Sequence, residues 1–203
     1  QLMRAQTESK TFPAMPELKP ADQVNNASEY AGRYLGADGR KIDLVAQGEK
    51  LFLVENGARA PLERHGEDSF LVHHKDWERY SLVFRRADES DPKSVVVEAG
   101  WGSLWFANAQ YKGPKAFEYP KEWNSYDGHY RNENPWIGSL HVVIRKGKLM
   151  IDGETPLEPG EGGVFYLRDE EHSPEWIQFG DIVNGKAMKL KLSGEDLWRV
   201  ETA

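Results

Sequence analysis

The histidines and glycines of this sequence form the patterns that come closest to metal or phosphate binding. His73 and His74 are the nearest pair of histidines. Neighbouring residues on a strand point to opposite faces, so these two rings cannot easily ligate one ion. The glycine-rich segment 160–163 leads into the apolar run 164–167, which is typical of a strand, whereas a phosphate loop leads into a helix. The sequence therefore predicts no metal site and no cofactor.

Nucleophilic catalysis needs an activated hydroxyl or thiol with a base in reach. The chain has no cysteine and no Gly-x-Ser-x-Gly string. Tyr130-Arg131-Asn132 matches a Tyr-x-Asn pattern of some serine hydrolases, but Tyr130 has a repeat counterpart in Tyr34, which a structural role explains. Acidic clusters such as 88–91 fall in expected turns, which favours solvated loops over a glycosidase pair. The sequence predicts no catalytic residue, and the chain alone is expected not to be an enzyme.

A repeated unit indicates the architecture. It contains Tyr30-Ala-Gly32-Arg-Tyr34, which recurs as Tyr126-Asp-Gly128-His-Tyr130, followed by the matching pairs Phe70/Phe165, Phe84/Phe179 and Leu104-Trp105/Leu197-Trp198. The offset drifts by a few residues where turns are expected, as in a duplicated domain whose strands keep their length. Two domains related by internal duplication are therefore predicted.

The hydrophobic pattern inside each copy has a period of two residues. Met188, Leu190 and Leu192 alternate with two lysines, which indicates a strand with one buried face. Asn-Gly, Asp-Gly and Lys-Gly pairs between such runs suit tight hairpins. About eight strands per copy are best accommodated by closure into a barrel, which leaves no exposed edge; a small sandwich is the alternative. The expected fold class is all-β, with two tandem eight-stranded antiparallel barrels of the lipocalin-like meander type.

Composition along the chain gives the expected domain bounds. Residues 1–26 are polar and proline-bearing and form a linker or arm. Residues 27–111 form the first barrel, 112–122 form a proline-stiffened connector, and 123–203 form the second barrel. A barrel of eight short strands is just wide enough for its own large side chains or one small ligand, so both interiors are expected to be mostly filled. Function is then expected at a rim, on a loop or at an interface.

Tryptophans are the main candidates for binding. Trp105 and Trp198 are repeat partners and are expected in the cores, whereas three others have no counterpart in the other copy. One interpretation places those three in a packed interface between the barrels. Another makes them a platform for a sugar ring or another flat ligand, because aromatic faces stack well; docking against a further domain is a third. The candidate binding residues are Trp101, Trp123, Trp136, Tyr126 and His129.

The charge of the chain argues against two classes of partner. The formal net charge is −7, without long runs of one sign, whereas nucleic acids and anionic membranes require clustered lysine and arginine. No apolar stretch approaches the ~20 residues of a membrane span. Neither a nucleic-acid partner nor a membrane span is expected. The lack of cysteine excludes disulfides and fits any compartment.

The order of the repeated residues resembles a known family. Tyr-x-Gly-x-Tyr, then Gly48-Glu-Lys-Leu51 or Gly147-Lys-Leu149, then Pro-Leu and Phe, is similar to the lipocalin-like barrels of β-lactamase and penicillin-binding-type serine hydrolases. The chain looks like the two-barrel tail of D-aminopeptidase-like members, and the resemblance covers about residues 27–200. In that family the catalytic residues belong to a separate N-terminal domain, which the barrels support or cover. The resemblance implies that 1–26 is an interdomain linker and that the location is periplasmic or secreted.

Two functions follow as expectations. The first is a non-catalytic accessory region that packs on or gates a serine hydrolase domain of the same parent chain. The second is a free-standing protein that binds a small molecule, a lipid or a sugar, in a barrel or between the barrels. The first predicts no turnover by the chain alone, and the second predicts a cavity of roughly a few hundred Å³ with convergent polar groups.

Overall fold

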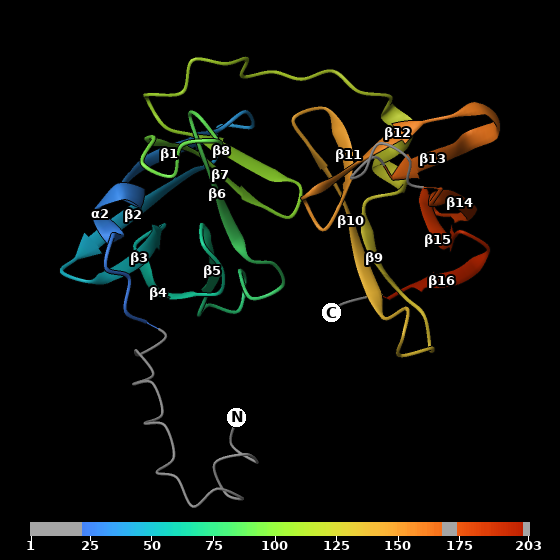
Figure 1. The fold of residues 1–203 in the computed structure, drawn as a ribbon, viewed down its shortest axis with the longest axis horizontal. Coiled ribbons are helices and arrows are strands. Elements are labelled where there is room, and N and C mark those ends of the chain that lie inside the picture. The colour runs from blue at the N-terminus through green and yellow to red at the C-terminus, as the bar shows by residue number, and fades with distance from the viewer. Residues whose placement is uncertain (1–21, 168–173, 201–203) are drawn as a thin grey trace, which may run out of the picture.

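The structure, a computed structural model, describes residues 22–167 and 174–200. Two closed barrels of eight antiparallel strands lie side by side (Figure 1). The predicted all-β fold of two eight-stranded barrels is confirmed, and so is the internal repeat; the lipocalin-like type stays a prediction. Within the described ranges no helix is both long and apolar enough to cross a membrane.

Barrel 1 is a meander in which each strand pairs with the next. Its strands are β1 (Gly32–Gly36), β2 (Lys41–Gln47), β3 (Lys50–Glu55), β4 (Ala58–Arg64), β5 (Ser69–Val72), β6 (Leu82–Arg86), β7 (Val96–Trp101) and β8 (Leu104–Ala107). β1 closes the barrel by pairing with β8, where Leu35 lies opposite Ala107. A one-turn helix, α2 (Ala27–Tyr30), precedes β1 and packs against β2 and β3.

Barrel 2 has the same meander order. Its strands are β9 (Gly128–Arg131), β10 (Ser139–Arg145), β11 (Lys148–Ile151), β12 (Thr155–Pro159), β13 (Val164–Leu167), β14 (Trp176–Val183), β15 (Lys186–Leu192) and β16 (Glu195–Arg199). β16 closes the barrel against β9, where Trp198 lies opposite Arg131. The glycine-rich segment forms the short 3₁₀ turn η2 (Glu161–Gly163), which leads into strand β13 rather than into a helix.

The segments next to the barrels take part in them. Val24, which the sequence assigns to the arm, is fully buried in the core of barrel 1, and its N–H donates to the carbonyl O of Glu49 (2.7 Å). The connector runs along one side of both barrels (Figure 1) and ends in the 3₁₀ helix η1 (Lys121–Ser125), which contacts β15. Residues 1–21 of the expected arm lie outside the described residues.

The Asn-Gly and Lys-Gly pairs form the hairpin turns. Asn56, Lys146 and Asn184 have φ values of 49°, 53° and 50°, and the glycine after each also has a positive φ. Two successive positive φ values describe the turn type whose twist matches that of the flanking strands. These pairs therefore favour the observed register of their hairpins.

Large side chains fill both barrels. In barrel 1, Tyr30, Tyr34, Phe70 and Phe84 are almost completely buried, and their ring centroids lie 4.9 to 5.9 Å apart in contacting pairs. Inward-facing aliphatic residues of the strands complete this cluster, and an equivalent cluster forms around Tyr130 in barrel 2. Both interiors are thus occupied by the protein's own side chains, in keeping with the narrow width of an eight-stranded barrel.

The repeated Tyr-x-Gly-x-Tyr unit is a packing and hydrogen-bonding device. The hydroxyl of Tyr34 donates to the carbonyl O of Tyr30 (2.9 Å), and that of Tyr130 donates to Tyr126 (2.8 Å). In the second copy Gly128 leaves room for the guanidinium group of Arg199 on β16, which a Cβ at this position would contact. Barrel structure therefore explains the shared tyrosines.

Candidate functional site

Trp101 belongs to the packing at one end of barrel 1. Its ring lies 5.1 Å from the rings of both Trp77 and Tyr80, and its indole N–H donates to the carbonyl O of Trp77 (2.9 Å). Tyr80 in turn contacts the ring of His141 in barrel 2 at 4.9 Å. Trp101 is therefore separated from the second barrel by one side chain.

His129 lies beside the same junction between the barrels. Its ring stacks on His141, with 4.2 Å between centroids and 23° between planes. Its Nε2 atom is buried without a hydrogen-bond partner among the described residues. Burial, followed by electrostatic repulsion from His141 and Arg79, lowers the pKa of His129. The neutral ring is therefore favoured at this position.

Trp123 and Tyr126 close one end of barrel 2. The Tyr126 ring stacks on Phe179 at 4.1 Å, with only 5° between planes, and contacts Phe165 at 5.9 Å. Trp123 packs edge-on against Phe165 at 6.0 Å. These two candidates therefore pack on the core of barrel 2, on the side opposite the loop that carries Trp136.

Trp136 is exposed on the loop between β9 and β10, with 93% of its surface accessible. The loop is held in shape by its own side chains: Oδ1 of Asn132 accepts the N–H of Asn134 (2.6 Å), and Oδ1 of Asn134 accepts the N–H of Trp136 (3.1 Å). The Asn132 amide also donates to the carbonyl O of Asp196 (2.7 Å). The five predicted residues thus lie in three places: the junction, the end of barrel 2 and this loop.

The expectation that Trp105 and Trp198 both lie in the barrel cores is wrong for Trp198, whereas Trp105 is buried. Their sequence neighbours Phe106 and Leu197 belong to the core clusters, so both tryptophans point outward from the pleated strand. Trp198 is 51% exposed, whereas Trp105 is 9% exposed because Phe117 of the connector packs against it. A position shared by the two copies is therefore not always a core position.

A buried arginine joins the barrels. Nε and Nη2 of Arg145, at the end of β10, donate to the carbonyl O of Gly102 in barrel 1 (3.2 and 2.7 Å), and Nη1 donates to Gly153 (3.4 Å). The guanidinium lies so close to Gly100 that a Cβ there would be 2.7 Å from it. Burial lowers the pKa of Arg145 to about 10, which leaves it charged at neutral pH.

Three further polar contacts cross the junction. The hydroxyl of Ser103 donates to the Asp127 carboxylate and accepts the N–H of Ile144 (2.9 Å). Lys146 Nζ lies 2.9 Å from each carboxylate oxygen of Glu98, which is itself buried. Burial raises the pKa of the Asp127 carboxyl. The junction is therefore built from specific, partly buried hydrogen bonds.

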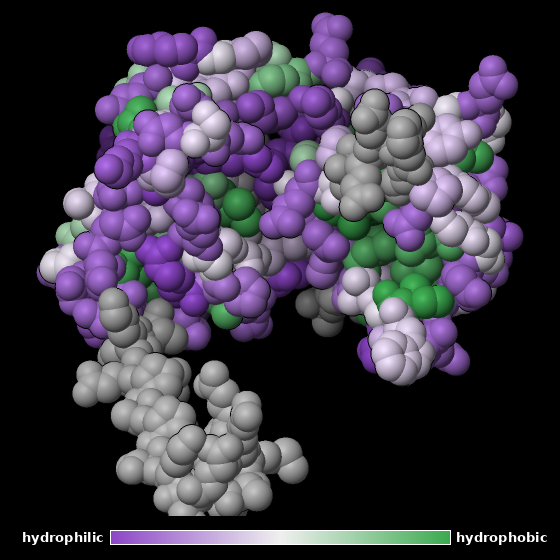
Figure 2. Space-filling model, in the orientation of Figure 1, coloured by the Kyte–Doolittle hydropathy of each residue, from purple (hydrophilic) through white to green (hydrophobic). Residues whose placement is uncertain are grey.

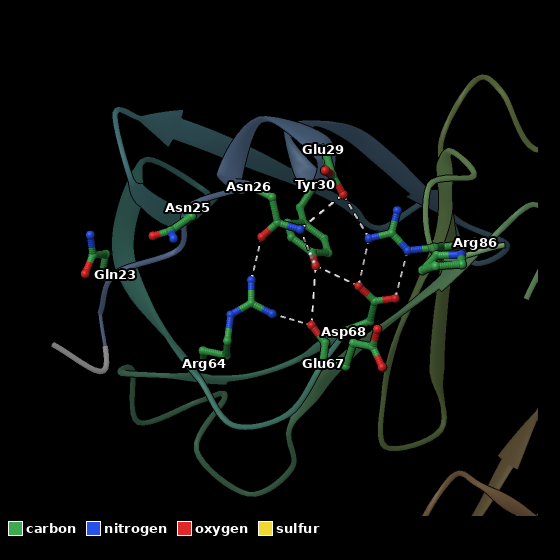
Figure 3. Close-up of a pocket in the computed structure, with 10 residues that line it drawn as sticks. Gln23, Asn25, Asn26, Glu29, Tyr30, Arg64, Glu67, Asp68 and Arg86 are labelled. Carbon is green, nitrogen blue, oxygen red and sulfur yellow. Dashed lines mark hydrogen bonds and ion pairs between the residues drawn. The ribbon is translucent and has the colours of Figure 1, made fainter. Parts of the chain in front are cut away.

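A polar pocket of about 520 Å³ lies beneath α2 at one end of barrel 1 (Figure 3). Arg86, on β6, pairs with both oxygens of Asp68 (3.0 and 3.1 Å) and with Glu29 (2.9 Å). The Tyr30 hydroxyl donates to Oδ1 of Asp68 (2.6 Å). The hydrogen bonds that Arg86 donates to the Asp68 carboxylate raise the pKa of Arg86. One wall of the pocket is thus a closed ion-pair network.

Arg64 forms the opposite wall of this pocket (Figure 3). Its guanidinium donates to Oδ1 of Asn26 (2.6 Å) and to the carbonyl O of Glu67, and it lies 4.9 Å over the ring of Phe70. Its hydrogen-bond acceptors are neutral oxygens, and no described carboxylate forms an ion pair with it. Asn25 and the Glu67 carboxylate line the same pocket without a described side-chain partner. Asn25 and Glu67 at this rim are therefore available to form hydrogen bonds with a bound group.

The pocket residues differ between the two copies. When the phenylalanines are aligned, Asp68 and Arg86 correspond to Gly163 and Asp181 in the second copy. Most residues that the copies share lie in the cores, whereas these unshared charged residues form an ion pair in the pocket. A comparison of charge between the copies is the signal that could have identified it from the sequence.

One further sequence pattern is typical of a catalytic site. Ser90-Asp91-Pro92-Lys93 matches the Ser-x-x-Lys string of penicillin-recognising hydrolases. It lies in an exposed turn between β6 and β7, where the Ser90 hydroxyl donates to Oδ1 of Asp88 (2.6 Å). The same oxygen accepts the N–H of Ser90 (2.9 Å). The hydroxyl is therefore used in a local turn rather than paired with Lys93 as a nucleophile with its base.

Within residues 22–167 and 174–200, no group of three or more histidine, aspartate or glutamate residues is arranged to hold a metal ion. His73 contacts Glu63 (2.8 Å), whereas His74 contacts Asp76 (3.7 Å). Comparisons with protein-family models, curated proteins and solved structures found no match to this chain. Any function is therefore inferred from the geometry of these surfaces and from the sequence resemblance.

Proposed function

We propose that this chain is a non-catalytic accessory module that packs on, or controls access to, a separate catalytic domain. The partner that the resemblance implies is a serine hydrolase of the β-lactamase type. The observation that carries the proposal is the filling of both barrels by their own side chains. With the interiors occupied, recognition falls to the outer surface.

A ligand inside a barrel, as in the alternative function, would have to displace core aromatic rings. Tyr34 and Phe84 in barrel 1, for example, are 0% and 2% exposed. Burial of one such side chain stabilises a protein by about 1.5–3 kcal/mol. Emptying two or three of these positions would remove much of the roughly 5–15 kcal/mol that stabilises a domain. This cost disfavours an internal ligand and supports recognition from outside.

The junction supports the same proposal. Buried Arg145 and the Ser103–Asp127 hydrogen bond connect the two barrels, so a partner meets both through one joined surface. An accessory module that shapes access to a neighbouring active site needs such a defined relation between its parts. Two barrels joined only by a long flexible linker would not have such a defined relation to each other.

The pocket beneath α2 is the surface that best suits a polar partner segment. Among the described residues, no carboxylate forms an ion pair with the Arg64 guanidinium. Asn25 and Glu67 add an amide and a carboxylate at the rim of the pocket. The space-filling view shows this barrel as mainly hydrophilic on the face seen in Figure 2. A carboxylate of the partner would satisfy Arg64 without disturbing the Arg86–Asp68 pair.

The test is binding of this chain to a separately purified β-lactamase-type domain encoded in the same gene, measured by isothermal titration calorimetry. We expect saturable binding that Arg64→Gln weakens by about tenfold, the loss of one charged hydrogen bond. Arg33→Gln is the matched control, because Arg33 pairs with Asp43 on an exposed strand. Absence of such a domain, or of binding to it, would overturn the accessory role. Equal binding by both variants would exclude the pocket as the contact surface.

A further inference from the structure

A second cavity, of about 320 Å³, lies between the barrels beneath the connector. Its volume falls in the range of small-molecule sites. Barrel 1, the connector and barrel 2 all contribute to its walls. The residues with groups suited to recognition are Asp38, Trp105, Tyr119, Asn124, Asp127 and Lys146.

The connector gives this cavity an aromatic wall. Phe117 packs edge-on against Trp105, with 5.3 Å between centroids and 90° between planes. Tyr119 stacks on Trp123 at 6.5 Å and remains 38% exposed. Two aromatic residues of the connector therefore line the cavity from one side and leave ring surface available for contact.

Polar groups with unused hydrogen-bonding capacity converge on the same cavity. Lys146 Nζ has three N–H donors and uses two on Glu98. Asn124 accepts the Tyr119 hydroxyl through Oδ1 (3.2 Å), and its amide N–H groups have no described partner. Asp38 accepts the N–H of Arg40 through Oδ1 (2.9 Å), which leaves Oδ2 available.

Asp127 adds a second carboxylate to the cavity. Its Oδ2 accepts the hydroxyl of Ser103, and Oδ1 has no hydrogen-bond partner in the described ranges. Asp127 and Ser103 both line the cavity from the junction side, opposite the connector. The polar groups of the cavity thus include acceptors on two carboxylates and donors on an ammonium and an amide.

The roof of the cavity is preformed. Gly147 has a φ of 73°, and a Cβ there would lie 2.9 Å from the carbonyl O of Glu118 and 3.1 Å from the side chain of Phe117. The connector can approach the β10–β11 turn this closely only because position 147 is glycine. A preformed site reduces the ordering cost of binding.

We propose that this cavity binds a single sugar ring. The C–H face of a sugar packs on aromatic rings, and its hydroxyls donate to carboxylates and accept from ammonium and amide groups. A lipid tail would offer no hydrogen bond to the free carboxylate oxygens of Asp38 and Asp127 or to the third N–H of Lys146, which is costly when these groups are desolvated. An inorganic anion would face two carboxylates. The proposal does not depend on the accessory role.

Titration with glucose, galactose and N-acetylglucosamine, followed by tryptophan fluorescence of the full chain, tests the proposal. Because Trp105 lines the cavity, at least one of these sugars is expected to cause a saturable change in emission. The variant Trp136→Phe, which removes the exposed tryptophan outside the cavity, is expected to retain this change. Saturation by decanoate or by phosphate, without saturation by any of the sugars, would overturn the proposal.

Two variants assign the binding to this cavity. Asn124→Ala removes the unused amide donors, and Asp38→Asn keeps the turn acceptor while removing the carboxylate charge. Each is expected to weaken sugar binding by about tenfold, which corresponds to one lost hydrogen bond. Asn25→Ala, an amide of the pocket beneath α2, is the matched control and is expected to bind like the parent. Unaltered binding by Asp38→Asn and Asn124→Ala, with circular dichroism matching the parent, would overturn the assignment.

Discussion

The guanidinium of Arg145 in barrel 2 donates two hydrogen bonds to a single carbonyl oxygen, that of Gly102 in barrel 1. Gly102 lies in the β7–β8 turn, and Arg145 ends β10. Hydrogen bonds to a charged group contribute about 1.5–3 kcal/mol each, more than bonds between neutral groups. This contact is therefore a main determinant of how the two barrels are joined.

Substitution of Gly100 tests the joint without removing a charge. A Cβ at this buried position would lie 2.7 Å from the Arg145 guanidinium, whose own hydrogen bonds hold it in place. We expect Gly100→Ala to lower the free energy of unfolding by about 1–3 kcal/mol, the range for overpacked sites. Gly180→Ala is the control, because a Cβ there meets nothing within 4 Å. Equal stability of the two variants in urea would argue against close packing of the Arg145 guanidinium on Gly100.

The Asp68–Arg86 pair is expected to matter more than a surface pair. The Arg86 side chain is 9% exposed, and Asp68 also accepts the Tyr30 hydroxyl. Because Glu29 still partners Arg86, Asp68→Ala is expected to cost about 2–3 kcal/mol of unfolding free energy. Asp43→Ala breaks the exposed pair with Arg33 and is expected to cost under about 1 kcal/mol. Chemical denaturation measures both, and a similar cost would contradict the structural role of the pocket network.

The buried tyrosines predict a loss of stability at alkaline pH. Burial raises the pKa of Tyr34 and of Tyr130 to about 12. Since the folded-state pKa exceeds the ordinary value of about 10, their contribution is complete below pH ~10 and is lost as pH rises toward ~12. Tyr34→Phe is expected to reduce this alkaline loss, measured as unfolding free energy against pH. A parent protein with constant stability from pH 10 to 12 would refute the prediction.

Asp127 predicts a pH dependence in the acid range. Burial raises its pKa in the folded state, so its contribution to stability is complete below the unfolded-state pKa. That contribution is lost as pH rises through the raised folded-state pKa. Asp127→Asn, which can still accept the Ser103 hydroxyl, is expected to remove this loss and to be at least as stable as the parent at pH 7. Asp43→Asn is expected to have the opposite effect and to lower stability at pH 7, because the hydrogen bond with Arg33 lowers the pKa of Asp43 in the folded state.

Local patterns predicted the strands well because most of them have one buried face and one that is more exposed. The alternation in 188–192 and the turns at Asn56 and Asn184 recur in the structure as β15 and as hairpins. The period of two residues does not show which face points inward. The repeat pairing of Trp198 with Trp105 predicts a core position for both, but Leu197 fills the interior of barrel 2 instead of Trp198.

The candidate binding surfaces were harder to predict, because each combines residues from strands that are far apart in the sequence. Arg145 meets Gly102 only through the packing of one barrel on the other, which no local pattern encodes. The pocket beneath α2 joins Asn26, Arg64 and Arg86 from a helix and two strands. Differences between the copies carried part of this information, whereas most of the shared residues lie in the cores.

Turnover by the purified chain tests the central claim of a non-catalytic module most directly. A chromogenic cephalosporin and a D-alanine anilide serve as substrates for β-lactamase-type and D-aminopeptidase-type activity. The account predicts hydrolysis no faster than in buffer, with the same rate for the parent chain and for Ser90→Ala. Hydrolysis by the parent that Ser90→Ala or any other single substitution abolishes, with the fold retained, would contradict it.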